Sequence, residues 1–166
     1  MNIRECLFTT LAVVMPFVAA AQEPSPDSIG VVRAATEYYR DVRLKGPIVI
    51  DQKLPYFHGP VVGAGVIDEV AKTPRTTKGR LSEHIVCADS ISGRRKRSVC
   101  VMPRGHVGAV VTYTDLVIRN DTAKLDVVYH RVGANRSVEY GEEALTLVRT
   151  AGGQWKVERV DERGVS

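Results

Sequence analysis

Apolar residues near the start of the chain recur with the period of an α-helix. The repeating positions lie three or four residues apart: Ile29, Val32, Ala35, Tyr39 and Val42. This spacing places them on one face of a helix. Ser25 is a favourable N-cap and Pro26 suits the first helical position, while Gly46 and Pro47 stop the helix. The pattern therefore predicts an amphipathic helix that begins at Pro26 and ends before residue 45.

The second half of the chain alternates apolar and polar positions with the period of a β-strand. This alternation is clearest over residues 123–132, and residues 107–119 are rich in Val, Tyr and Thr, as strands are. Further strands are predicted over residues 138–150 and 154–161. Short turns separate them at residues 120–122, 133–136 and 151–153, where Asn, Asp and Gly are concentrated. Strands joined by such short turns pair with their sequence neighbours. We therefore expect an antiparallel meander of three to four strands.

The region between these two parts is less regular. Its pattern predicts a short strand over residues 48–50 and a second, weaker helix over residues 61–72. It also predicts a strand over residues 81–88. The chain has neither a βαβ alternation nor a glycine-rich phosphate loop, which argues against a nucleotide-binding α/β fold. Helices followed by a long meander indicate an α+β fold, with N-terminal helices packed on one face of a curved antiparallel sheet.

The first residues have the features of a secretory signal peptide. Residues 7–18 carry no charge and follow Arg4, and three alanines end at Ala21. This apolar run is shorter than the roughly 20 residues that a membrane-spanning helix needs, although a retained anchor helix is the alternative. We expect cleavage after Ala21, which would remove Cys6. The mature protein would then be a single domain, residues 22–166, that is secreted or periplasmic.

The net charge of the chain does not indicate a particular binding partner. The formal net charge is +4, and residues of opposite sign are mixed along most of the chain. Such a mixture favours solubility and does not indicate a nucleic-acid partner. One cluster stands apart from it, because four consecutive cations follow Gly93: Arg94, Arg95, Lys96 and Arg97. An exposed loop of this composition can bind phosphate, an acidic polysaccharide or an anionic membrane surface, or can simply be solvated.

Two cysteines, Cys87 and Cys100, remain after the predicted cleavage. An oxidising compartment favours a disulfide between them, which would stabilise the fold by about 3 kcal/mol in the chain-entropy model. Zinc is the alternative, with His84 and His106 completing a four-ligand set. The spacing of these four residues matches no standard zinc finger, so we expect the disulfide and no metal.

A resemblance to a known superfamily is carried by the helix at residues 29–42 and by the closing hairpin. In that hairpin an apolar strand, residues 145–149, precedes a glycine turn and then Trp155-Lys156-Val157. This order resembles the nuclear-transport-factor-like and polyketide-cyclase-like superfamily. The resemblance implies a cone-shaped, cystatin-like fold with a pocket in its concave sheet. It implies no single activity, because the fold hosts isomerases, cyclases and dehydratases as well as proteins that only bind.

Within such a pocket, Asp115 and Tyr113 are the candidate catalytic residues. Residues two apart on a strand share a face, and a carboxylate beside a phenol can act as a general base. Exposure of Asp115 and pairing with a neighbouring cation is the alternative. We consider Tyr39, His58 and His130 as candidate ligand-binding residues.

Three functions follow from these features. The sequence favours a non-enzymatic protein that binds a small apolar ligand or a protein partner in the concave sheet. A small cyclase or isomerase that uses Asp115 and Tyr113 is the second possibility. A module that binds anionic surfaces through the basic cluster is the third. None of them requires a cofactor.

Overall fold

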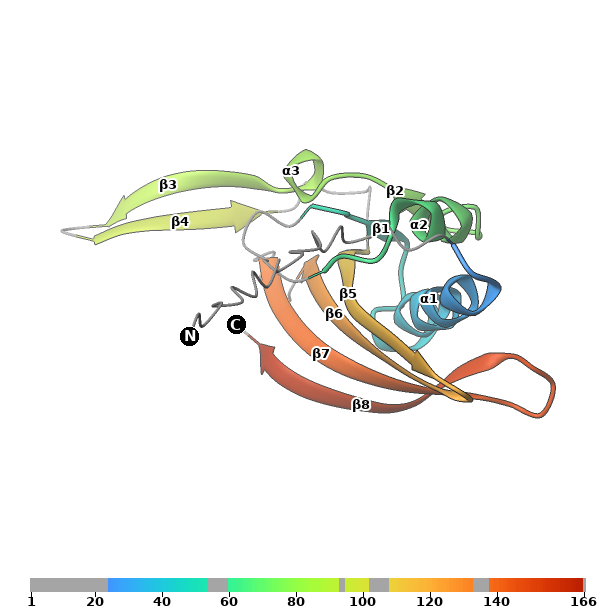
Figure 1. Ribbon diagram of the computed structural model, residues 1–166. Helices are drawn as coiled ribbons and strands as arrows, with labels where there is room; N and C mark the ends of the chain where they lie inside the picture. Colours follow the sequence, from blue (N-terminus) through green and yellow to red (C-terminus); the bar gives the residue numbers. More distant parts are fainter. Residues whose placement is uncertain (1–23, 54–59, 93–94, 102–107, 133–137, 166) are drawn as a thin grey trace, which may run out of the picture.

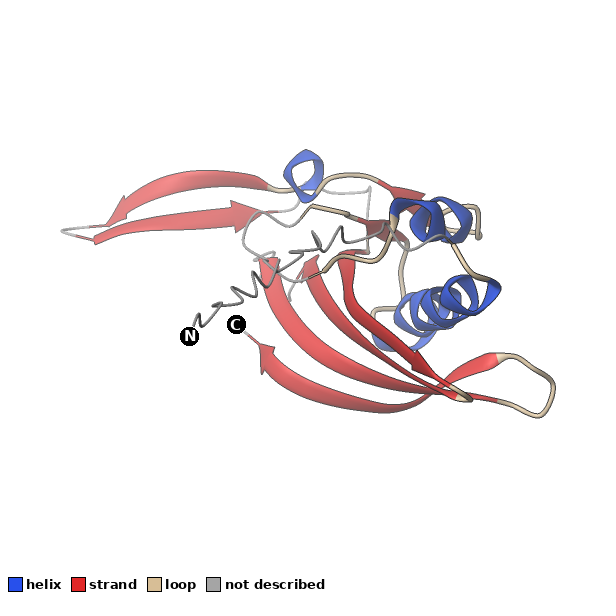
Figure 2. Ribbon diagram, in the orientation of Figure 1, coloured by secondary structure: helices blue, strands red, loops and turns tan. Residues whose placement is uncertain are grey.

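A computed structural model describes residues 24–53, 60–92, 95–101, 108–132 and 138–165. Two helices lie against one face of a curved six-stranded sheet, and a two-stranded hairpin extends away from it (Figure 1). Figure 2 shows helices α1 and α2 together beside the sheet, opposite the direction in which the hairpin projects. The α+β class is confirmed. Within the described residues, no helix is long and apolar enough to cross a membrane.

Helix α1, Pro26–Tyr38, begins where the sequence predicts. Ser25 caps it, because its hydroxyl accepts a hydrogen bond from the backbone amide of Ser28 in a capping box. The helix continues as a π-helical turn, η1, over Tyr39–Arg43. The prediction that Val42 shares the buried face is wrong: Val42 is 58% exposed, whereas Tyr39 is fully buried. The wider π-turn rotates Val42 away from the apolar stripe.

The sheet has the strand order β2-β1-β5-β6-β7-β8. Its strands are β1 (Ile48–Ile50), β2 (Thr76–Lys78), β5 (Ala109–Arg119), β6 (Thr122–Val132), β7 (Val138–Arg149) and β8 (Trp155–Val165). The predicted meander is confirmed, because β5 to β8 pair in sequence as antiparallel neighbours. The prediction of a wholly antiparallel sheet is wrong. Strand β1 runs parallel to both β2 and β5.

The middle of the chain supplies α2 (Ala64–Val70), α3 (Leu81–His84), β3 (Val86–Ser92) and β4 (Arg95–Val101). The second predicted helix therefore exists but is shorter than its pattern. The strand predicted over residues 81–88 does not begin at residue 81, because Leu81–His84 forms a helical turn. Strands β3 and β4 pair antiparallel in a sheet of their own. Arg95, Lys96 and Arg97 thus belong to a strand and not to the expected loop.

The core lies between the sheet and helices α1 and α2. Its largest members are fully buried: Tyr39, Tyr113, Tyr129, Ile48, Ile50, Ile67, Leu125, Leu145 and Leu147. On the opposite face of the sheet, Val49 and Val110 pack against Leu81 and Ile85 around α3. Both faces near β1 are therefore covered, which fixes the position of the chain that leaves this strand.

Candidate functional site

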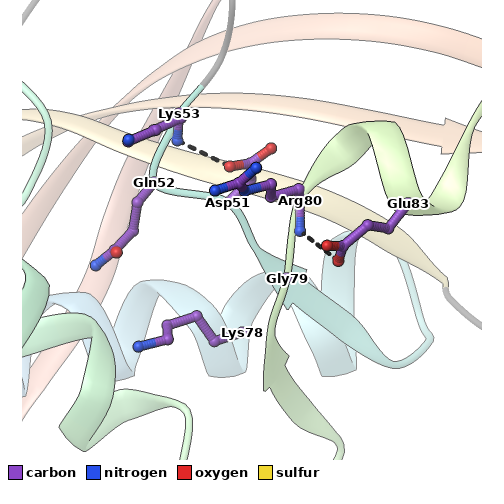
Figure 3. A pocket seen from close by; sticks show the side chains of 7 residues that line it. All are labelled: Asp51, Gln52, Lys53, Lys78, Gly79, Arg80 and Glu83. Carbon is purple, nitrogen blue, oxygen red and sulfur yellow. Dashed lines mark hydrogen bonds between the residues drawn. The ribbon is translucent and has the colours of Figure 1, made fainter.

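A polar pocket lies where the parallel strands β1 and β2 end. The residues that follow the two strands line it, together with the last residue of β2 and one residue of α3: Asp51, Gln52, Lys53, Lys78, Gly79, Arg80 and Glu83 (Figure 3). Its volume is about 350 Å³. The carboxyl ends of parallel strands are a common position for ligand sites, because the chain diverges there and leaves a crevice.

Asp51 holds the two sides of this pocket together. Its side chain is buried, and its Oδ1 accepts the backbone amide of Lys53 at 2.8 Å. Its Oδ2 accepts the backbone amide of Leu81 at 2.6 Å, which ties the end of β1 to the start of α3. The Thr112 hydroxyl donates to the Asp51 backbone carbonyl at 2.8 Å, which anchors Asp51 on β5. The Asp51 carboxylate is thus occupied by the pocket's own backbone.

Glu83 plays a similar part on the other side. Its Oε2 accepts the backbone amide of Arg80 at 3.1 Å, closing the first turn of α3. Both carboxylates that line the pocket therefore have backbone partners, as the dashed lines from Asp51 and Glu83 in Figure 3 show. Neither needs a cation from the pocket to satisfy it.

The cations that line the pocket differ from these carboxylates in their partners. Lys78 forms an ion pair with Asp68 on α2. Within the described part of the chain, neither Lys53 nor Arg80 has a carboxylate within ion-pair distance. The amide nitrogen of Gln52 is buried and, among the same residues, has no hydrogen-bond partner. Lys53, Arg80 and Gln52 thus present donors for which the described residues supply no acceptor.

A second polar group joins η1 to β6 and β7, and we call it the Glu143 cluster: Glu143, Tyr39, Tyr129 and Arg43. Glu143 is fully buried. It accepts hydrogen bonds from the hydroxyls of Tyr39 and Tyr129 and, at 2.7 Å, from Arg43. Burial, reinforced by the Glu143 hydrogen bond, raises the pKa of Tyr39 well above its usual value, so its phenol stays protonated. Tyr39, predicted as a ligand-binding residue, therefore contributes to the buried core of the protein.

Sequence reasoning missed Glu143, although a signal for it was present. Glu143, Leu145 and Leu147 alternate along β7, and both leucines lie in the core. A glutamate on the apolar face of a strand is unusual and indicates a buried partner. The pocket residues Lys53, Lys78 and Arg80 gave no comparable signal, because they lie in segments that only the tertiary structure brings together.

Tyr113 lies just before an irregularity in β5, and Asp115 lies inside it. Tyr113 is buried, and its hydroxyl lies 2.8 Å from the Thr36 hydroxyl. Asp115 lies within a β-bulge between Thr114 and Val117, with a left-handed backbone (φ 51°). A bulge interrupts the alternation from which a shared face was predicted. Their action as an acid and base remains a prediction.

Leu125 and Tyr129 lie on one face of β6, and His130 lies on the other face. It is half-buried, with its ring 5.4 Å from that of Tyr140. Burial lowers its pKa, and the charge of Asp51 partly opposes this shift. His58 and Arg94 lie outside the described residues. Within those that are described, no group of three or more His, Cys, Asp or Glu side chains is placed to hold a metal ion.

The chain was also compared with known proteins. No family model, curated protein or solved structure matches it. The resemblance to the nuclear-transport-factor-like superfamily remains a prediction. The candidate site rests on the geometry of the pocket itself.

Proposed function

We propose that this protein is a non-enzymatic binding protein whose pocket between β1, β2 and α3 takes a small anion with a carboxylate or phosphate group. One observation carries the proposal: Asp51 and Glu83 are satisfied by backbone amides, while Lys53 and Arg80 face the same pocket without a carboxylate partner among the described residues. An anion that enters would find donors that are not already engaged (Figure 3).

The size and polarity of the pocket support a small, charged ligand. A volume of about 350 Å³ is near the lower end of the range for small-molecule sites. Most such sites are largely apolar, whereas five of the seven residues that line this one carry a charge. Lysine and arginine bind carboxylates and phosphates through charge-assisted hydrogen bonds, which are stronger than those between neutral groups. The pocket therefore suits a compact organic acid or phosphate better than an apolar ligand.

The proposed site lies away from the concave face of the sheet, where the sequence places the ligand. On the face covered by the helices, Tyr113 and Tyr129 of the sheet pack together with Tyr39 of η1 as core. A ligand there would have to displace them. The pocket beside β1 and β2 needs no such rearrangement, because its volume already exists.

Calorimetric titration with inorganic phosphate and with succinate tests the proposed site. We expect saturable binding of at least one of them by the purified protein, weakened as salt is added. A Lys53→Gln, Arg80→Gln variant removes both cations that lack a carboxylate partner. Loss of even one charge-assisted hydrogen bond corresponds to about tenfold weaker binding or more.

The matched control is Lys72→Gln, Arg159→Gln, which removes two cations outside the pocket and changes the net charge equally. It should bind as the unmodified protein does. Equal weakening in the control and the pocket variant would show that net charge, and not the pocket, attracts the anion. The absence of binding for both probes would contradict the proposal.

We also propose that the chain is exported and that Cys87 and Cys100 form a disulfide. Strands β3 and β4 pair in a register that makes Cys87 and Cys100 direct partners. Partners in an antiparallel ladder have Cα atoms about 4.5–5.5 Å apart, within the range that disulfides span. The bond would also support a two-stranded hairpin, which is only marginally stable by itself.

Alkylation without reduction tests the disulfide. In protein purified from the bacterial periplasm without reductant, we expect the peptides containing Cys87 and Cys100 to stay unmodified by iodoacetamide and to appear as one cross-linked species. After reduction both should react. Reaction of both thiols before reduction would contradict the bond. Protection that a chelator abolishes would instead indicate the zinc alternative.

A further inference from the structure

The β3–β4 hairpin is set apart from the rest of the molecule. Its strands pair from Val86 with Val101 to Ser92 with Arg95, and they form a sheet separate from the six-stranded one. Figure 1 shows strands β3 and β4 extending away from the six-stranded sheet. Seven residues of strand span about 20 Å. The Ser92–Arg95 pair, at the outer end of the two strands, therefore lies well clear of the body.

The charge of the protein is concentrated on this hairpin. Residues 86–101 contain four cations, at positions 94 to 97, and one acid, Asp89. Four minus one gives +3, out of a net charge of +4 for the whole chain. The remainder of the chain is thus nearly neutral, and an anionic surface would attract the hairpin first.

The register explains why this charge is not neutralised across the hairpin. Arg95 pairs with Ser92, Lys96 with Ile91, and Arg97 with Ser90, so the direct partner of each cation is uncharged. Alternation along β4 places positions 95 and 97 on one face of the hairpin and position 96 on the other. Basic register positions therefore occur on both faces of the hairpin, close to the Ser92–Arg95 pair. This arrangement suits contact end-on and not along one side.

From this placement we propose that the protein attaches to anionic phospholipid membranes through the outer part of β4, with Arg95, Lys96 and Arg97 against the lipid phosphates. A linear polyanion is bound best by cations spread along a groove, whereas these are gathered at one projecting end. A flat, charged surface can meet such an end while the body stays clear of it. Clusters of lysine and arginine are the usual means of attachment to anionic leaflets.

Co-sedimentation with lipid vesicles tests this attachment. We expect the purified protein to sediment with vesicles of mixed phosphatidylglycerol and phosphatidylcholine but not with phosphatidylcholine alone. Binding should disappear at about 1 M salt, where the Debye length falls to about 3 Å. Each lysine or arginine near an anionic leaflet strengthens attachment about fivefold, so an Arg95→Gln, Lys96→Gln, Arg97→Gln variant should bind roughly a hundredfold more weakly.

The matched control is Lys72→Gln, Lys124→Gln, Lys156→Gln, which removes three exposed cations from the body. It should retain its attachment, and both variants should unfold at the temperature of the unmodified protein. Equal binding by the hairpin variant would overturn the proposal. So would hairpin-dependent retention on heparin without sedimentation on vesicles, because it would assign the cations to an acidic polysaccharide. The small-anion pocket is unchanged in the hairpin variant, so the two proposals can fail separately.

Discussion

Replacing Glu143 by Ala is expected to lower the free energy of unfolding by about 3–4 kcal/mol. The side chain is fully buried and accepts hydrogen bonds from the hydroxyls of Tyr39 and Tyr129. Its removal leaves both phenols without that acceptor in a buried space. It also removes one of the two carboxylates that pair with Arg43. Buried polar groups left without a partner, here the two phenols, are costly. Urea denaturation at neutral pH measures the difference.

Glu162 offers the matched control for this substitution. Arg43 also pairs with Glu162, but that carboxylate is 59% exposed where Glu143 is fully buried. Exposed ion pairs contribute little, so Glu162→Ala should change the free energy of unfolding by less than about 1 kcal/mol. Glu143→Gln should fall between the two, because it keeps an acceptor for one phenol but removes the charge that faces Arg43. Equal effects of Glu143→Ala and Glu162→Ala would show that the cluster does not stabilise the fold.

The features predicted well from the sequence are those that local interactions determine. The helix begins at Pro26 because Ser25 and Ser28 cap it within four residues. The β5 to β8 meander forms because its turns are short and its strands alternate. Both depend on residues close together in the chain, where helix periods, caps and turn residues act.

The features that the sequence did not predict depend on distant residues. Three apolar residues, Ile48–Ile50, do not specify their neighbours, so the parallel pairing of β1 with β2 and β5 was missed. The helical turn at Leu81 depends on a hydrogen bond to Asp51, which is thirty residues earlier. The pocket follows from these same contacts. Its cations come from chain segments whose proximity no local pattern encodes.

At Gly141, the addition of a single methyl group should lower the stability of the fold substantially. It pairs with Tyr129 across β6 and β7, and the Tyr129 ring lies over it. A Cβ atom at position 141 would lie 2.2 Å from Cζ of Tyr129 and 2.4 Å from its hydroxyl oxygen. The ring has little room to retreat, because it is buried beside Tyr39 and its hydroxyl donates to Glu143. We therefore expect Gly141→Ala to lower the free energy of unfolding by about 2–3 kcal/mol.

Gly164 on β8 is the control for this substitution, since a Cβ atom there would meet nothing within 4 Å. Gly164→Ala should leave the free energy of unfolding within about 0.5 kcal/mol of its original value. A double-mutant cycle identifies the clash as the cause. With Tyr129→Leu already in place, Gly141→Ala should cost at least about 1 kcal/mol less than it does alone, because the ring atoms that it strikes are gone. Additive effects of the two substitutions would mean that Gly141 is required for a reason other than the approach of Tyr129.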